Sequence, residues 1–292
     1  MEYVIVAALV LVACFFIYKQ RGKKSFRDTQ YYKITHNEYW QTKSDKGRYG
    51  EYLIYKQLES LEKDGAQFLF NCYMPSGTHG ITEVDVIMVH TSGIYVFESK
   101  NYAGWIFGDE RDRQWTQSLV SKDRTKIKNY FFNPLKQNRI HIRALRAIIG
   151  YDKRPIYSVV VFTDRSVLKN VNYTDRYARV VTQDDLLLAV RGLKRRSENV
   201  LTAEEVSNIK SALYPYTQVS DSVKQAHVEN IKAHLERKRE QGRLPVARRM
   251  GPRKKFKPVK CFTSPYYKRS SSFDVRRRNK NSACRQYYGA CF

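Results

Sequence analysis

The feature that most constrains this chain is the stretch 83–100, EVDVIMVHTSGIYVFESK, in which two apolar, β-branched runs meet at a Thr-Ser-Gly sequence. This pattern predicts a β-hairpin. If Thr91 and Ser92 form the loop, His90 pairs with Gly93 and the register of the whole hairpin follows. Strand alternation then predicts that four residues of the first run share one side of the sheet: Glu83, Asp85, Ile87 and Val89.

In that register Asp85 lies opposite Glu98, and Glu83 lies opposite Lys100. Like charges directly opposed on a sheet are destabilising. The Asp85–Glu98 pair therefore requires a cation between the carboxylates, a raised pKa on one of them, or a different register. We favour a divalent ion held by hard oxygen ligands, because the same strands are apolar elsewhere and are expected to be buried. An exposed polar face with an ordinary Glu83–Lys100 salt bridge is the simpler alternative.

The charge of the chain restricts its partners. Its 292 residues have room for one domain of ordinary size plus appendages, and 42% of them are hydrophobic, which is compatible with a packed core. The formal net charge of +25 predicts binding to polyanions, nucleic acid first and anionic membrane surface second. The five cysteines show no pairing pattern, which fits a reducing cytosolic compartment.

Residues 3–18 carry no charge and would span roughly 24 Å as a helix, just short of the ~30 Å hydrocarbon core of a bilayer. A cleaved signal peptide is the competing interpretation, but the acidic Glu2 and the lack of a small-residue cleavage site disfavour it. A buried core helix is a weaker rival. Basic residues crowd the downstream flank, which places the bulk of the chain in the cytoplasm. We predict an uncleaved single-pass membrane anchor at 1–20 and a linker at 21–45.

The segment that follows predicts an amphipathic helix from Gly47, with five apolar residues at helical spacing: Tyr49, Leu53, Ile54, Leu58 and Leu61. Glu51 lies beside this stripe, where a carboxylate could simply complement the helix dipole. Asn133 and Pro134 are typical of a helix start, as N-cap and first helical residue. The remaining pattern predicts strands at 66–74, 113–119, 156–162 and 179–182, and a turn with a short strand at 101–109. It also predicts a basic loop at 121–130 and helices at 184–190, 202–213 and 220–238.

From residue 237 onward the composition changes to 18 Lys or Arg residues against two acidic ones, a net charge of +16, with interleaved aromatic residues. Few aliphatic residues remain, which predicts disorder or a marginal module. Basic residues among aromatic ones suit nucleic acid, whereas a solvated tail that touches acidic lipid is the alternative. The candidate nucleic-acid contacts in the basic loop and the tail are Lys122, Arg124, Lys126, Lys128, Arg253, Lys254, Lys255, Lys257, Arg276, Arg277 and Arg278.

Five residues form a candidate catalytic set: Glu51 on a helix, Asp85 and Glu98 on adjacent strands, Lys100, and Gln137 in the first turn of a later helix. Phosphodiester hydrolysis needs a metal ion that polarises the phosphate and supplies hydroxide near neutral pH, and two or three carboxylates can hold such an ion. A lysine two residues past the last carboxylate shares its strand face. It could steady the attacking water or the developing charge.

The chain resembles the nuclease-related domain family, NERD, within the broad PD-(D/E)XK restriction-endonuclease-like group. The matching words are GRYGE at 47–51, EVD at 83–85, GIYVFESKNYAG at 93–104, Trp115 and NPLKQ at 133–137. This resemblance implies an α/β core of order α-β-β-β-α-β, with a mixed central sheet flanked by helices, over residues 46–165. Residues 166–236 would complete or pack on that core, and residues 237–292 would form the tail.

The resemblance also implies metal-dependent cleavage of nucleic acid, DNA more than RNA. Glu51, Asp85 and Glu98 would be the metal-site carboxylates for Mg²⁺ or Mn²⁺. Lys100 would be the catalytic lysine, and Gln137 would support the site together with the catalytic Asp85 and Glu98. The alternative function is a non-catalytic tether that holds nucleic acid, or anionic lipid, at the membrane through the basic tail.

Some members of the family carry a zinc ribbon at the C-terminus, and the end of this chain faintly resembles half of one. The sequence stops just after Cys291, and Ser264 stands where a partner for Cys261 would be needed. A tetrahedral site needs four ligands. We therefore expect no zinc.

Overall fold

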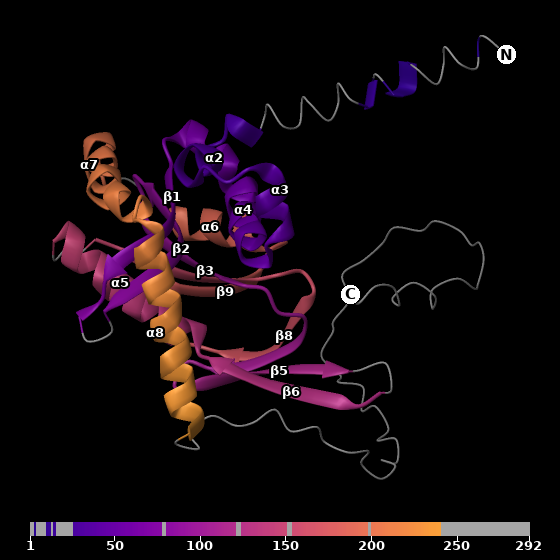
Figure 1. Cartoon of the computed structure of the whole chain (residues 1–292). Coiled ribbons are helices and arrows are strands. Elements are labelled where there is room, and N and C mark those ends of the chain that lie inside the picture. Colours follow the sequence, from indigo (N-terminus) through magenta and orange to yellow (C-terminus); the bar gives the residue numbers. More distant parts are fainter. Residues whose placement is uncertain are drawn as a thin grey trace, which may run out of the picture. The chain divides into compact units, whose positions relative to one another are not determined.

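The computed structural model of this chain describes residues 3, 10–12, 14–15, 26–77, 80–120, 124–150, 154–197 and 200–240 (Figure 1). Most of the predicted anchor at 1–20 and the predicted tail beyond residue 240 lie outside these residues, including all of its candidate nucleic-acid contacts and cysteines. Within the described residues, no helix combines the length and the apolarity that crossing a membrane requires. The predicted anchor therefore stays a prediction.

A five-stranded sheet forms the centre of the fold, in the order β1-β2-β3-β7-β9. Its strands are β1 (Gln67–Pro75), β2 (Ile81–His90), β3 (Gly93–Lys100), β7 (Ile156–Phe162) and β9 (Ala178–Thr182). The pairs β1–β2 and β2–β3 are antiparallel, whereas β3–β7 and β7–β9 are parallel, so the sheet is mixed. The predicted strand at 156–162 is confirmed as β7, and all seven of its residues are buried, as its continuous apolar run requires.

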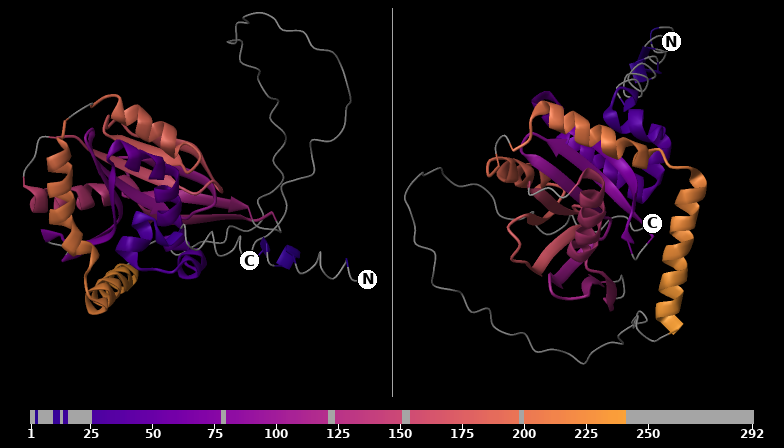
Figure 2. Two further views of the ribbon diagram at one scale, coloured as in Figure 1. Left: turned by 90° about the horizontal axis from the view of Figure 1, so that it is seen from above. Right: turned by 90° about the vertical axis from the view of Figure 1, so that its left-hand side faces the viewer.

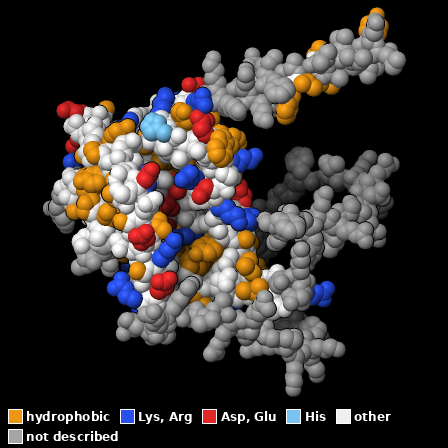
Figure 3. All heavy atoms as spheres, in the orientation of Figure 1, with side chains coloured by type: hydrophobic (Ala, Val, Ile, Leu, Met, Phe, Trp, Pro, Cys, Tyr) orange, Lys and Arg blue, Asp and Glu red, His pale blue; other side chains and the backbone are white. Residues whose placement is uncertain are grey.

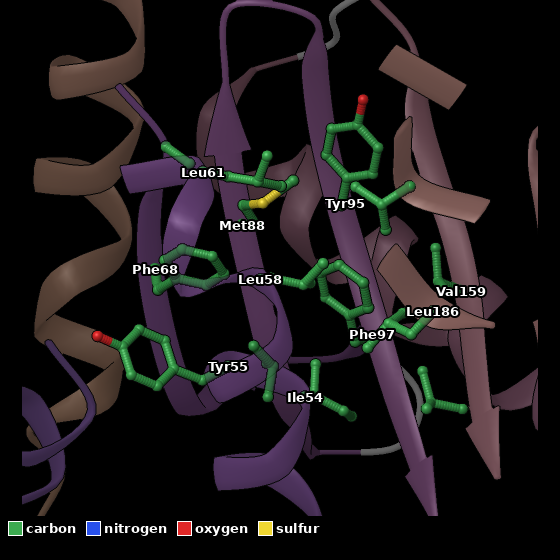
Figure 4. Packing of buried hydrophobic residues seen from close by; sticks show 14 of the residues in the cluster. Ile54, Tyr55, Leu58, Leu61, Phe68, Met88, Tyr95, Phe97, Val159 and Leu186 are labelled. Carbon is green, nitrogen blue, oxygen red and sulfur yellow. The ribbon is translucent and has the colours of Figure 1, made fainter. Parts of the chain in front are cut away.

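One face of this sheet packs against α4 (Lys46–Leu58), α6 (Leu186–Lys194) and α2 (Gln30–Thr35) (Figures 1 and 4). The side chain of Asp45 caps α4 by accepting hydrogen bonds from the backbone N–H groups of Gly47 and Arg48. The helix then places its apolar stripe on the aromatic face of the strands, as Figure 4 shows for Leu58 and Phe97. The predicted amphipathic helix is confirmed.

The opposite face of the sheet packs against α5 (Pro134–Ile149) and α7 (Ala203–Leu213). Asn133 caps α5 through its side-chain oxygen, and Pro134 occupies the first turn, as the sequence predicts. The central sheet is therefore the middle layer of a three-layer α/β/α arrangement. The predicted order α-β-β-β-α-β is present as α4, β1, β2, β3, α5 and β7.

A second, four-stranded sheet is inserted between β3 and α5 and is completed by a later strand. It has the order β6-β5-β4-β8, with strands β4 (Gly104–Asp109), β5 (Gln114–Val120), β6 (Lys126–Phe132) and β8 (Ser166–Asn172). The β5–β6 hairpin extends away from the helices (Figures 1 and 2). The prediction of a basic loop at 121–130 was wrong for its second half, because Lys126 and Lys128 lie in β6.

The remaining elements are short helices and one long helix: α3 (Tyr39–Ser44), η1 (Glu59–Asp64), η3 (Tyr214–Thr217) and α8 (Asp221–Glu240). The segment expected to be a linker contains α2 and α3 instead of irregular chain. Tyr31 of α2 is fully buried, and its ring meets Phe70 of β1 edge-on with centroids 4.9 Å apart. These aromatic contacts dock a segment that has no regular apolar period on the core.

Candidate active site

The β2–β3 hairpin adopts the predicted register, with His90 opposite Gly93 and Val86 opposite Phe97. Backbone pairing ends at Val86–Phe97, so the predicted Asp85–Glu98 and Glu83–Lys100 pairs lie beyond the ladder. Asp85 replaces the missing pairing with its side chain, because its Oδ2 accepts a 2.8 Å hydrogen bond from the backbone N–H of Ser99. The two strands thus separate where the acidic residues begin.

An irregularity in β1 reverses the side-chain alternation beside Asp85. Asn71 has a left-handed backbone (φ 50°), and the flanking pairs Phe70–Val86 and Cys72–Val84 place it opposite Asp85. Asn is among the few residues that tolerate this conformation. Phe70 and Val86 face the α4 side, whereas Cys72 and Val84 face the α5 side.

The prediction that one side of β2 carries Glu83 and Asp85 together with Ile87 and Val89 was therefore wrong. Val84 packs in the same cluster as Ile87, although strict alternation would separate them. Glu83 forms no Glu83–Lys100 salt bridge either. Its Oε1 instead accepts a 2.6 Å hydrogen bond from the hydroxyl of Tyr73.

Glu51 reaches the site from α4, which lies close to β3. A Cβ added to Gly50 would lie 2.5 Å from the Ser99 hydroxyl, so the helix approaches this closely because residue 50 is glycine. Glu51 is buried, and its Oε2 accepts a 3.1 Å hydrogen bond from the amide Nδ2 of Asn71. The carbonyl Oδ1 of Asn71 is buried and has no hydrogen-bond partner among the described residues.

Glu98 occupies the α5 side of the site, and both of its oxygens are engaged. Its Oε1 lies 2.6 Å from Lys100 Nζ, and its Oε2 lies 2.9 Å from His141 Nε2. The other imidazole nitrogen of His141 lies 2.8 Å from the Thr82 hydroxyl. Lys100 Nζ also donates a 3.0 Å hydrogen bond to Gln137 Oε1. The predicted Glu98, Lys100 and Gln137 are thus in direct contact.

The pKa values of the site's carboxylates are shifted in different directions. Burial, and next the charge of Asp85, raise the pKa of Glu51 well above its ordinary value. Burial, and next the charge of Glu98, raise the pKa of Asp85 in the same way. Burial also opposes ionisation of Glu98, but the charge of Lys100 and the contact with His141 outweigh it, so the pKa of Glu98 lies below its ordinary value.

Two of the expected ways to accommodate the neighbouring carboxylates of Asp85 and Glu98 are present together. The pKa of Asp85 is raised, and a cation, the ammonium of Lys100, lies beside Glu98. The same two acids raise the pKa of Lys100, against the opposing effect of burial. The pKa values of the pair are thus shifted in opposite directions, that of Glu98 downward and that of Asp85 upward.

Sequence reasoning missed two members of the site, Asn71 and His141. His141 lies 43 residues from Glu98 and meets it only because α5 crosses the sheet. Its spacing of four residues from Gln137 on a helix was a usable signal, because such residues share a face. Asn71 could not be recognised in the same way, since its role depends on its own left-handed backbone conformation inside a strand, which the sequence pattern does not indicate.

The described candidates for nucleic-acid contacts lie in or next to the second sheet. Arg124 precedes β6, and Lys126 and Lys128 lie on β6 in the second sheet. Lys122 and the candidates in the tail lie outside the described residues.

The oxygen donors near Asp85 suit a hard divalent ion. Asp85 and Glu51 repel one another electrostatically, and the unpartnered Asn71 Oδ1 belongs to the side chain that binds Glu51. Carboxylate and amide oxygens are the ligands that Mg²⁺ and Mn²⁺ prefer. In the described part of the chain, no three Asp, Glu, His or Cys side chains are already gathered as a set that could hold a metal ion.

This fold and site define a mixed α/β domain with an acidic cluster and a half-buried lysine at the end of its central sheet. Residues 46–163 match the profile of the family described as "Nuclease-related domain", NERD. The chain is similar to an uncharacterised protein of Bacillus anthracis, pXO1-01, with 29% identity over 186 residues, which cover 64% of this chain and 84% of the relative.

Among solved structures, the chain has a weak likeness to AF1548, a protein of unknown function. The likeness has a TM-score of 0.25 and 11% sequence identity, and it covers 62% of this chain and 97% of that one.

Proposed function

We propose that this protein is a metal-dependent nuclease that hydrolyses phosphodiester bonds of nucleic acid, with DNA favoured over RNA. The observation that carries the proposal is the contact of Lys100 with Glu98 and Gln137, next to Asp85, inside a nuclease-related domain. This arrangement agrees with a restriction-endonuclease-like site, in which an acid–x–lysine strand end lies beside a second acid.

The residues around Lys100 hold its ammonium group in a fixed position. Glu98 holds Lys100 by an ion pair that is shielded from water, since Glu98 is only 2% exposed and Lys100 is 16% exposed. Gln137 fixes the direction of the lysine with a second hydrogen bond. A preorganised ammonium of this kind stabilises negative charge that develops on a phosphate during hydrolysis. His141 keeps Glu98 in place and is a positioning residue.

Asp85 and Glu51 would hold Mg²⁺ or Mn²⁺, with Glu98 as the third carboxylate of the predicted set. When bound, such an ion polarises the phosphate and lowers the pKa of a coordinated water. The backbone N–H of Ser99 orients the Asp85 carboxylate, and Asn71 orients that of Glu51. Both acids have raised pKa values, so cation binding by these carboxylates should strengthen as pH rises.

A cleavage assay on the full chain tests this proposal. Labelled single-stranded and duplex DNA and RNA are incubated with Mg²⁺, with Mn²⁺ or with EDTA. We expect metal-dependent cleavage that falls by about 10²- to 10³-fold in Asp85→Ala and in Lys100→Ala, the usual effect of removing one preorganised stabilising group. The matched controls are Asp184→Ala and Lys63→Ala, which remove exposed charges elsewhere and should cleave like the wild type.

Wild-type cleavage by both site variants would refute the assignment. A chain that binds nucleic acid but cleaves none of these substrates would support the non-catalytic tether instead. Attachment to the membrane through residues 1–20 forms part of the proposal, with the bulk of the chain in the cytoplasm. Cell fractionation of the full chain and of a chain lacking residues 1–20 tests it, since both should fractionate alike if the segment is no anchor.

A further inference from the structure

The outward face of the second sheet exposes large aromatic side chains among lysines. We call it the aromatic–lysine face and define it by Trp105, Lys126, Lys128, Tyr130, Phe132 and Lys169. The exposed fractions of its three rings are 45% for Trp105, 47% for Tyr130 and 41% for Phe132. Globular proteins rarely gather exposed rings on one surface unless that surface binds something.

Strand alternation fixes which side these residues occupy. Along β6, Lys126, Lys128, Tyr130 and Phe132 are exposed, whereas Phe131 between the last two is buried. The opposite side of the sheet carries Ile106, Trp115 and Phe131, which form a core with Leu135 and Phe162. The exposed rings are therefore not part of the hydrophobic core, because the opposite side of the sheet already supplies the residues that pack there.

The register interleaves rings and positive charges across this face. Trp105 pairs with Ser118, and Ser118 pairs with Lys128, so the lysine lies two strands, or about 10 Å, from the indole. Lys169 Nζ lies 5.3 Å from the centroid of the Trp105 ring. Tyr130 and Phe132 follow one another on the same side of β6, about 7 Å apart along the strand.

We propose that the aromatic–lysine face binds single-stranded nucleic acid, with its rings stacked on bases and its lysines contacting phosphates. A flat sheet that presents rings between cations is suited to unstacked bases, whose faces are accessible only in single strands. Charge complementarity favours this polyanion over a second copy of the chain, since two such faces would bring lysines together. A membrane would bury the rings, but it offers no planar partner for them.

The face adjoins the candidate active site along the chain. β4 begins at Gly104, four residues after Lys100, and the connection is anchored where the hydroxyl of Thr163 donates a 2.6 Å hydrogen bond to the Tyr102 carbonyl. The Gly104 N–H also donates to the Arg165 carbonyl. On the side of the molecule seen in Figure 1, Figure 3 shows hydrophobic side chains next to Lys and Arg side chains. This binding proposal rests on the proposed function in one respect, the choice of nucleic acid as the ligand. It adds that the bound nucleic acid is single-stranded.

Binding of fluorescent oligonucleotides to the full chain in EDTA tests the proposal without cleavage. We expect Trp105→Ala and Tyr130→Ala each to weaken single-strand binding by about tenfold, in line with the loss of one stacked base. Trp40→Ala and Tyr214→Ala are matched controls, because both remove exposed rings from other surfaces. A salt concentration of about 0.3 M reduces the contribution of the basic tail, which is mainly electrostatic.

A second readout reports stacking directly. The chain has three tryptophans, and Trp115 is fully buried, so quenching by a bound single strand should be lost in Trp105→Phe and kept in Trp40→Phe. Trp105→Phe should still bind, because a phenyl ring also stacks. Equal affinity in Trp105→Ala, Tyr130→Ala and the wild type, with quenching unchanged in Trp105→Phe, would overturn the proposal.

Two other outcomes would also overturn it. One is a change in oligomeric state, measured by sedimentation, that Trp105→Ala causes with no change in single-strand affinity. The other is a loss of binding to anionic vesicles in the same variant, again with unchanged single-strand affinity. Failure of the nuclease proposal is distinct, since a chain that never cleaves can still bind and be quenched in EDTA.

Discussion

The acidic site and the aromatic–lysine face lie on adjoining sheets but are built on opposite principles. In the acidic site, Glu98, His141 and Thr82 are almost fully buried and each engages a partner through hydrogen bonds. On the aromatic–lysine face, the rings are more than 40% exposed and the lysines are exposed as well. Burial makes the charges of the first region strong and fixed, whereas exposure leaves the second free to contact a long, variable polymer.

The largest expected effect is on stability. Glu98→Gln in the acidic site should lower the free energy of unfolding far more than Tyr130→Ser on the aromatic–lysine face. Glu98→Gln leaves Lys100 and His141 without their shared carboxylate, and we expect the free energy of unfolding to fall by about 3 kcal/mol. Tyr130→Ser changes an exposed ring, and we expect a change within about 0.5 kcal/mol. Urea denaturation of the full-length variants measures both. Equal losses would show that the acidic site is no more rigidly held than the face.

A smaller effect is expected from the residue that positions Glu98. His141→Ala removes the hydrogen bond to Glu98 Oε2, and we expect cleavage to fall by about 10- to 100-fold, as for other residues that orient a metal-site carboxylate. His141→Gln retains an N–H donor and should restore part of the rate. If His141→Gln and His141→Ala are equally impaired in kcat, orientation through this hydrogen bond is not what His141 provides.

Features of the acidic site could be predicted from the sequence where they depend on neighbouring residues, and could not where they depend on distant ones. The hairpin register was predictable, because a two-residue turn fixes it within a few residues. The left-handed Asn71 was not, because strand alternation assumes an extended residue at every position, and one exception reverses the faces of Val84 and Val86. Of the candidate site, the sequence predicted Glu51, Asp85, Glu98, Lys100 and Gln137. It did not predict His141, which lies 43 residues from Glu98 and contacts it only in the folded chain.

The second sheet was only partly predicted for a related reason. β6 carries lysines on its exposed side, so its sequence alone resembles a basic loop. The residues that its inward side contacts are not evident from the sequence of β6. Its place in a sheet depends on pairing with β5, in which Trp115 and Phe131 face the common core. Similarly, α2 and α3 lack a regular apolar period, and the aromatic contacts that hold α2 involve residues far away in the sequence.

Two helical glycines test how closely α4 must approach the site. Gly50→Ala brings a methyl group against the Ser99 hydroxyl, and we expect a loss of about 1 kcal/mol in unfolding free energy. Gly192→Ala meets nothing within 4 Å, and we expect a gain of about 0.5 to 1 kcal/mol from helix propensity. Adding Ser99→Ala to Gly50→Ala should recover the loss. Identical effects of the two glycine substitutions would contradict close packing of α4 on β3.

The smallest expected effect concerns the charge on Asp85 in the metal-free chain. Because its pKa is higher in the folded state than in the unfolded state, Asp85 favours folding at low pH, and this contribution is lost as pH rises through the folded pKa. At neutral pH we therefore expect Asp85→Asn to raise the free energy of unfolding, by up to about 1 kcal/mol. Asn keeps the oxygen that accepts from Ser99. Lower stability in Asp85→Asn than in the wild type, measured in EDTA, would contradict the raised pKa.

The central claim is that Asp85 and Glu51, beside Glu98 and Lys100, gather around a hard divalent ion. Titration of the full chain with Mn²⁺, followed by electron paramagnetic resonance of the free ion, measures this directly. We expect saturable binding that strengthens as pH rises, because both raised-pKa carboxylates must lose protons, and that is lost in Glu51→Gln and in Asp85→Asn. Binding that is absent, or that is unchanged in both variants, would contradict the account.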